Sequence, residues 1–237
     1  MPGLRHPPSR LLGPVLSTVL LSSLTLLAPP AAKAQTVEKE QVWLNLTVMG
    51  AMGEDGVYFV EAQPRIGDGA RLEPLLLRAA VGWKLSPDVA FYQGYGRIIT
   101  QVDQGPNLAE DRSFQQLSWT IARPQRGEIS SRTRLEQRWR SDGSGTAWRL
   151  REMIRAERQV APSGLAALAY AEVFVGLNDT EWGARSGFDQ LRSFVGAEVP
   201  AGGQSTIEVG YLNHWVHQGR GRDRVNHVAS IALFLRP

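Results

Sequence analysis

The chain has 237 residues, and its 26 Lys and Arg against 23 Asp and Glu give a formal net charge of +3. Three of the basic residues, Arg5, Arg10 and Lys33, lie within residues 1–34, which contain no acid, so the rest of the chain is formally neutral. A neutral chain has no bulk electrostatic attraction for nucleic acid. The absence of cysteine excludes a disulfide framework and thiol chemistry.

The N-terminus has the three parts of an export signal. Two arginines form a positive start, residues 11–27 are largely apolar, and Ala32-Lys33-Ala34 is a small-residue cleavage motif. The apolar segment is shorter than the ~20 residues of a membrane-spanning helix, and no cysteine follows it that could carry a lipid. We therefore expect residues 1–34 to be a cleaved signal peptide and residues 35–237 to form one mature domain.

Apolar and polar side chains alternate along the mature chain with the two-residue period of β-strands. In one stretch, Leu77, Val81 and Trp83 share a face opposite Arg78 and Lys84. From this pattern we predict strands near residues 41–50, 57–66, 72–85, 89–100, 112–122, 127–139, 146–158, 165–177, 187–199, 204–216 and 226–236.

Tight turns and longer polar links alternate between these segments. The tight turns are residues 85–88, 123–127, 161–164 and 200–203, and the longer links are 101–111, 140–145, 178–187 and 217–226. This alternation is typical of a transmembrane, antiparallel up-and-down β-barrel. The predicted segments number eleven, whereas such barrels usually have an even number of strands. The segments from residue 57 onwards make ten, so we predict about ten to twelve strands. The stretch 41–50 is then an extra strand at the seam, a segment in the lumen, or half of an unrecognised pair.

Two features favour a membrane barrel over a soluble barrel that buries its apolar face. Aromatic residues gather at the predicted strand ends: Trp139, Trp148, Tyr211 and Trp215 towards the long loops, and Trp83 and Trp119 towards the tight turns. Arginine dominates the basic residues of the mature chain, where only Lys39 and Lys84 are lysine; planar guanidinium groups suit confined pairing with carboxylates. We expect a bacterial outer-membrane protein whose partners are membrane lipid, lipopolysaccharide and the outer-membrane insertion machinery.

The charged face of these strands is the candidate functional site. Its expected lumen residues are Arg132, Arg134, Glu136, Arg138, Arg149, Arg151, Glu172, Arg192 and Glu208. One interpretation is a structural Arg/Glu ladder that fills a narrow barrel, because about eight strands leave room only for side chains. The other is a narrow pore that favours anions, as rings of Arg or Lys do.

A catalytic, metal-binding or nucleic-acid site receives less support. His214, His217 and His227 could converge near the long loops, yet no nucleophile is placed beside them. We name no catalytic residue, metal ligand or cofactor, and a lipid-modifying or proteolytic enzyme stays as the alternative. The arginines of residues 132–140 follow the strand period, which argues against a nucleic-acid arm. Residues 219–224 form either a loop that binds lipopolysaccharide phosphates or a solvated loop.

Short motifs in a characteristic order extend over nearly the whole mature chain. They are Val42-Trp43-Leu44, Glu61-Ala62-Gln63-Pro64-Arg65, Gly94-Tyr95, residues 110–117 (EDRSFQQL), residues 132–138 (RTRLEQR), Trp148-Arg149-Leu150-Arg151, Glu172-Val173-Phe174 and residues 207–212 (IEVGYL). In order and spacing the chain resembles the outer-membrane family filed as domain of unknown function 2490. The resemblance implies an outer-membrane β-barrel and brings no assigned activity, which leaves open a binding or assembly role through the outer loops. The chain departs from the family at Leu191, and it ends on Leu235-Arg236-Pro237 where barrels usually end on an aromatic residue.

Overall fold

The computed structural model describes residues 36–102, 104–219 and 221–237, which form a closed β-barrel. Its strands are β1 (Val37–Met52), β2 (Gly56–Ile66), β3 (Leu72–Ser86), β4 (Val89–Thr100), β5 (Leu108–Ala122), β6 (Gly127–Arg140), β7 (Ala147–Gln159), β8 (Ala166–Gly176), β9 (Gly187–Pro200), β10 (Thr206–Val216) and β11 (Arg224–Leu235), with a short 3-10 turn, η1 (Asp68–Ala70), between β2 and β3. The predicted signal peptide, residues 1–34, lies outside the described residues.

All the predicted strands are present, and the fold is the predicted all-β barrel. The boundaries differ most at two starts: β1 begins at Val37 rather than near 41, and β5 begins at Leu108 rather than near 112. Both extensions carry polar residues at the ends of strands, where the alternation of apolar side chains that defined the prediction fades.

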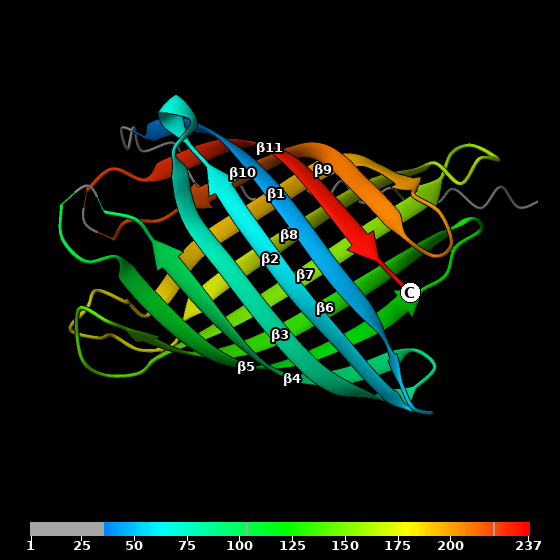
Figure 1. The fold of residues 1–237 in the computed structure, drawn as a ribbon, viewed down its shortest axis with the longest axis horizontal. Coiled ribbons are helices and arrows are strands. Elements are labelled where there is room, and N and C mark those ends of the chain that lie inside the picture. The colour runs from blue at the N-terminus through cyan, green and yellow to red at the C-terminus, as the bar shows by residue number, and fades with distance from the viewer. Residues whose placement is uncertain (1–35, 103, 220) are drawn as a thin grey trace, which may run out of the picture. The chain divides into compact units, whose positions relative to one another are not determined.

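A parallel pair of strands closes this barrel, which has an odd number of strands. Each strand pairs antiparallel with its neighbour in sequence, and β1 and β11 lie side by side at the seam (Figure 1). They pair in parallel, with Val42 opposite Ala229 and Leu44 opposite Ile231. Eleven strands of alternating direction leave the first and last running the same way, so only parallel pairing can close the ring. The stretch near 41–50 is therefore an extra strand at the seam.

The two ends of the barrel differ as predicted. Short turns gather at one end, and the longer connections between β4 and β5, β6 and β7, β8 and β9, and β10 and β11 gather at the other (Figure 1). In the tight turn between β1 and β2, Gly53 has a φ of 73°, a conformation that favours glycine. The strands are inclined to the long axis of the barrel, as barrel closure requires.

The outer surface of the barrel is largely apolar. Leu46, Val60, Leu77, Val195 and Val209, from five different strands, are between 42% and 61% exposed. Trp139 and Trp148 are exposed near the long-loop end, Tyr211 at the middle of β10, and Trp83 near the short-turn end, whereas Trp119 and Trp215 are half-buried. In the part of the chain that the structure describes, no helix is long and apolar enough to cross a membrane.

The interior combines charges with two apolar clusters. Trp43, Leu168, Phe194, Leu212 and Val228 form one cluster, with contributions from β1 and β8–β11. Phe59, Ala80 and Phe114 form the other, on β2, β3 and β5. The expectation of a charged inner face is therefore only partly right, because these clusters lie beside the arginines and glutamates.

Candidate functional site

The centre of the charged interior is the carboxylate of Glu136 on β6, which is 1% exposed. Arg149 on β7 donates two hydrogen bonds to its Oε2, from Nε at 3.0 Å and Nη2 at 2.6 Å. Arg151, two residues further along the same face of β7, donates from Nη1 to Oε1 at 2.6 Å. Both carboxylate oxygens of Glu136 thus have charged donors, which is what a buried carboxylate requires.

Arg151 also connects Glu136 to a second buried carboxylate. Its Nη2 lies 2.7 Å from Oε1 of Glu172 on β8. Arg132 on β6 donates to the same oxygen at 2.8 Å, and Arg192 on β9 approaches the other oxygen at 3.7 Å. The result is a continuous network of arginines and glutamates across β6–β9.

Two phenylalanine rings lie against the guanidinium groups of this network. The Phe174 ring centroid is 4.4 Å from Arg151, 4.7 Å from Arg192 and 5.1 Å from Arg149. Phe114 lies 4.3 Å from Arg134, and each ring is 1% exposed. Cations over a desolvated aromatic face are stabilised by the ring quadrupole. The rings therefore fix the planes of groups that would otherwise be costly to bury.

Two smaller charge clusters lie on either side of the central network. Towards the long-loop end, Glu110 on β5 accepts hydrogen bonds from Arg112 at 2.6 Å and Arg138 at 2.7 Å. Towards the short-turn end, Arg155 on β7 contacts Glu208 at 2.7 Å. Charged pairs therefore continue along much of the barrel wall.

All nine predicted lumen residues face the interior, but they do not form one cluster. Arg132, Arg134, Glu136, Arg149, Arg151, Glu172 and Arg192 share the central network, Arg138 belongs with Glu110, and Glu208 belongs with Arg155. The sequence did not assign Phe114, Phe174, Glu110, Gln116, Asp189 and Glu198 to the site, although all contact these arginines, nor Arg112, which contacts Glu110 and Glu136. The two-residue period could have identified those on β5, where Glu110, Arg112 and Phe114 share one face.

Several buried guanidinium nitrogens have no hydrogen-bond acceptor within the protein. Among the described residues they are Nε of Arg132, Nη1 of Arg134, Nε of Arg192 and Nε of Arg224. Three of these arginines belong to the central network. Because an unpaired buried donor is costly, the interior has residual capacity to bind small anions or water.

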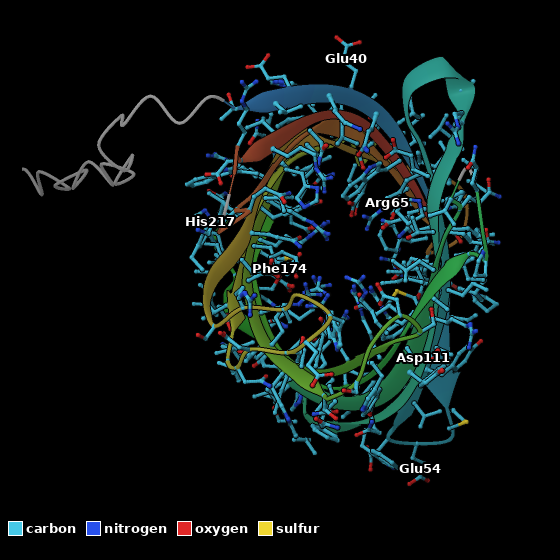
Figure 2. The ribbon with its side chains drawn as sticks, turned by 90° about the vertical axis from the view of Figure 1, so that its left-hand side faces the viewer. Glu40, Glu54, Arg65, Asp111, Phe174 and His217 are labelled. Atoms are coloured by element: carbon cyan, nitrogen blue, oxygen red, sulfur yellow. The ribbon has the colours of Figure 1, made fainter. Side chains whose placement is uncertain are left out.

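A cavity lies at each end of the barrel interior. One of about 630 Å³ at the long-loop end is lined by Trp43, Arg65, His214 and Arg224 among others. Another of about 430 Å³ at the short-turn end is lined by Lys84, Arg132 and Arg134 among others, and the two share no lining residue. Viewed from the long-loop end, Arg65 and Phe174 point into the barrel (Figure 2). Two arginines of the central network, Arg132 and Arg134, therefore face the short-turn cavity, whereas Trp43 faces the long-loop cavity.

The loops between β6 and β7 and between β8 and β9 fold over part of the long-loop mouth (Figure 2). Trp182 is 8% exposed and donates from Nε1 to the carbonyl of Gly145 at 3.1 Å. The guanidinium groups of Arg138 and Arg140 lie 5.2 and 5.1 Å from the Trp182 indole. This side of the mouth is therefore covered by an ordered indole.

The three histidines that could have converged occupy separate environments. His214 faces the interior, hydrogen-bonded to Gln190 at 2.9 Å and packed edge-on against Trp43 at 5.2 Å. His217 contacts Asp223 in the loop between β10 and β11, and His227 contacts the exposed Tyr211 on the outer face. They do not form one site. Across the described ranges, no group of three or more His, Asp or Glu side chains could hold a metal ion.

The fold and the interior together define a closed β-barrel with an Arg/Glu network inside and an apolar outer surface. The chain belongs to the family described as "Protein of unknown function (DUF2490)", which matches residues 40–226. It is also similar to an uncharacterized protein of Methylorubrum extorquens, with 43% identity over 222 residues that cover 92% of this chain and 97% of that protein. No solved structure matches the chain.

Proposed function

We propose that this chain is a bacterial outer-membrane β-barrel with a structural role, whose lumen is kept narrow by its Arg/Glu network. The observation that carries the proposal is burial: Arg134, Glu136, Arg149, Arg151 and Glu172 are each 1–3% exposed inside the barrel. A wide aqueous channel would leave such charges hydrated. The membrane location is supported by the apolar outer surface and by the aromatic residues near both ends, which are features of barrels in lipid.

Conductance measurements on the detergent-extracted protein in a planar bilayer test this proposal. Heat-shifted mobility on a gel confirms in parallel that the barrel is folded. The folded protein is expected to give no stepwise current. The double variant Glu136→Ala/Arg149→Ala removes one buried ion pair without changing the net charge, and it is expected to give conductance where the parent gives none. Large unitary currents from the folded parent would contradict a filled lumen.

A second candidate, a narrow pore that favours anions, is supported by the buried guanidinium nitrogens that lack acceptors. Rings of arginine select anions, and Arg65 and Arg224 line the long-loop cavity. Under a salt gradient such a pore gives small currents with an anion-favouring reversal potential. Replacement of Arg65 by Glu should then shift that potential towards cations, and an unchanged potential would count against this candidate.

A further inference from the structure

Most outward-facing side chains of this barrel are apolar, but four adjacent strands carry a polar area. Its members are Gln93, Tyr95 and Arg97 on β4, Asp111, Ser113 and Gln115 on β5, Ser131, Thr133 and Gln137 on β6, and Glu152 on β7. We call these ten residues the polar outer face. Outward positions of β1 and β3, such as Leu44, Leu46, Leu77 and Val81, are aliphatic. The asymmetry therefore distinguishes one side of the barrel from the rest.

Side-chain amides form a hydrogen-bonded row across three strands of this area. Gln137 on β6 donates to Oε1 of Gln115 on β5 at 2.9 Å, and Gln115 donates to Oε1 of Gln93 on β4 at 2.8 Å. Gln93 donates in turn to the hydroxyl of Ser113 at 3.2 Å. Each amide has two donor hydrogens and an acceptor oxygen with two lone pairs, so the exposed Gln93 and the half-buried Gln115 can also bond outwards, whereas Gln137 is buried.

The polar outer face also has opposite charges at its two sides. On β4 and β5, Asp111 accepts hydrogen bonds from Tyr95 at 2.5 Å and from Arg97 at 3.2 Å, and the Arg97 side chain is 50% exposed. On β7, the Glu152 carboxylate accepts hydrogen bonds from the hydroxyls of Ser131 and Thr133. Both donors to Glu152 are neutral. An exposed arginine paired with Asp111 thus lies at one side of the area, and a carboxylate with neutral donors lies at the other.

Contact with lipid chains is a poor environment for these groups. Ionisable side chains in hydrocarbon are costly, and in membrane proteins they face protein or water. The polar outer face is not confined to the strand ends, because it includes residues at the middle of β5 and β6. There Gln115 is paired with Leu135, and Thr133 is paired with Leu117. A protein surface that pairs with these groups would remove the cost.

We propose that the polar outer face is the contact surface of a homodimer, with a second copy of this chain as its partner. The proposal rests on the membrane location proposed above. A twofold axis parallel to the barrel axis and passing between β5 and β6 places β4 of one copy opposite β7 of the other. Arg97 then faces Glu152 of the second copy. The amide row meets its own copy near the axis, and amides are self-complementary, as an isologous interface requires.

The inclination of the strands brings Arg97 and Glu152 closer to the same position along the barrel axis, as this pairing requires. By register, Glu152 is opposite Thr133, Thr133 is opposite Leu117, and Leu117 is opposite Phe91, six residues before Arg97 on β4. Because the strands are inclined (Figure 1), each step along the hydrogen bonds from β4 to β7 also moves towards the long-loop end. This displacement moves Glu152 along the barrel axis towards the position of Arg97. A twofold axis parallel to the barrel axis can then bring the two charges together.

Cysteine cross-linking in native membranes tests the interface directly, since the chain contains no cysteine. Gln115→Cys, near the proposed axis, is expected to form a disulfide-linked dimer on mild oxidation. Leu46→Cys on β1, which is equally on the outer surface but away from this face, is the matched control and is expected to stay monomeric. A folded Gln115→Cys protein that remains monomeric, or that links only to a different protein, would overturn the proposal.

A charge exchange tests the predicted contact between the two copies. Arg97→Glu should weaken dimerisation at least tenfold, measured by sedimentation in detergent, because it places a carboxylate opposite Glu152. The double variant Arg97→Glu/Glu152→Arg should restore the dimer, and failure to restore it in a folded barrel would contradict the twofold arrangement. A protein found in the aqueous fraction would instead refute the membrane location, whereas a folded, membrane-extracted monomer refutes only the dimer.

Discussion

Arg155 on β7 places its Nη1 2.7 Å from Oε1 of Glu208 on β10, across the width of the two strands that separate them. Inward-facing side chains on strands three apart can meet in this way because the curvature of a small barrel makes them converge. Eleven strands lie between the eight of a filled barrel and the sixteen of a wide channel. The Arg155–Glu208 contact agrees with the filled end of that range.

The first prediction concerns the charge at the centre of the network. Glu136→Gln keeps the size of the side chain but leaves Arg149 and Arg151 with less negative charge nearby. Breaking a buried ion pair by neutralising one partner typically costs about 3–5 kcal/mol. We expect a loss of that order in the free energy of unfolding, measured by urea titration in detergent.

Glu54→Gln is the control for this change. Glu54 lies in the exposed turn between β1 and β2 (Figure 2), where removal of a surface charge is expected to change stability by less than about 0.5 kcal/mol. Equal stability of the Glu136 and Glu54 variants would mean that the central carboxylate contributes nothing to the fold.

The second prediction tests the contacts between guanidinium groups and a buried ring. Phe174→Leu retains an apolar side chain but removes the ring against which three guanidinium groups lie. Desolvated cation–π contacts contribute about 2 kcal/mol, so the variant should lose roughly that much more stability than Phe194→Leu. Phe194 is a suitable comparison because it is buried and stacks on Tyr170 at 4.9 Å. Similar losses for both variants would show that the guanidinium groups on Phe174 add nothing to what a buried, stacked ring contributes.

Strand periodicity predicts much of this barrel because each strand has one face in the interior and one outside. The parity that grouped Arg132, Arg134 and Glu136 is a property of the local backbone, and it holds in the structure. The parallel seam between β1 and β11 is different. It depends on the total number of strands, a global property that alternation within any one segment does not encode.

The composition of the site was harder to predict for a related reason. Phe114 and Phe174 are apolar residues on inward faces that also carry charges, and period alone gives no reason for them to lie under arginines. Their role follows from register, which places Phe174 opposite Arg151 and Phe114 opposite Glu136. Register between strands is set by pairing in three dimensions, so the sequence identified the arginines without their aromatic neighbours.

The third prediction tests the parallel seam. Leu44 and Ile231 are paired across it, and both side chains face outwards. Cα atoms of directly opposed residues lie within the separation that a disulfide requires. We therefore expect Leu44→Cys/Ile231→Cys to form an intramolecular disulfide that abolishes the heat shift under non-reducing conditions. Leu44→Cys/Leu235→Cys, four residues out of register, should not. Cross-linking of the offset pair alone would mean that β1 and β11 pair in a different register.

The fourth prediction concerns pH and the loop between β10 and β11. Asp223 accepts hydrogen bonds from the Trp215 indole at 3.0 Å, from His217 at 3.0 Å and from the backbone N–H of Gln218 at 3.1 Å. Partial burial opposes ionisation, but the Gln218 and Trp215 hydrogen bonds and the neighbouring His217 hold the pKa of Asp223 below its ordinary value of 3.8.

Because the folded-state pKa is lowered, the stabilising contribution is present above the ordinary value and is lost as the pH falls through the folded-state value. Protection of the Gln218 amide from hydrogen exchange, corrected for the intrinsic rate, should therefore be constant near neutral pH and fall below about pH 4, as the ordinary carboxyl pKa implies. Asp223→Asn keeps the shape and removes the charge, so its protection should be weaker at neutral pH and should not change across the acid range. If the parent protein keeps full protection down to pH 2 while Asp223→Asn behaves identically, the carboxylate does not order this loop.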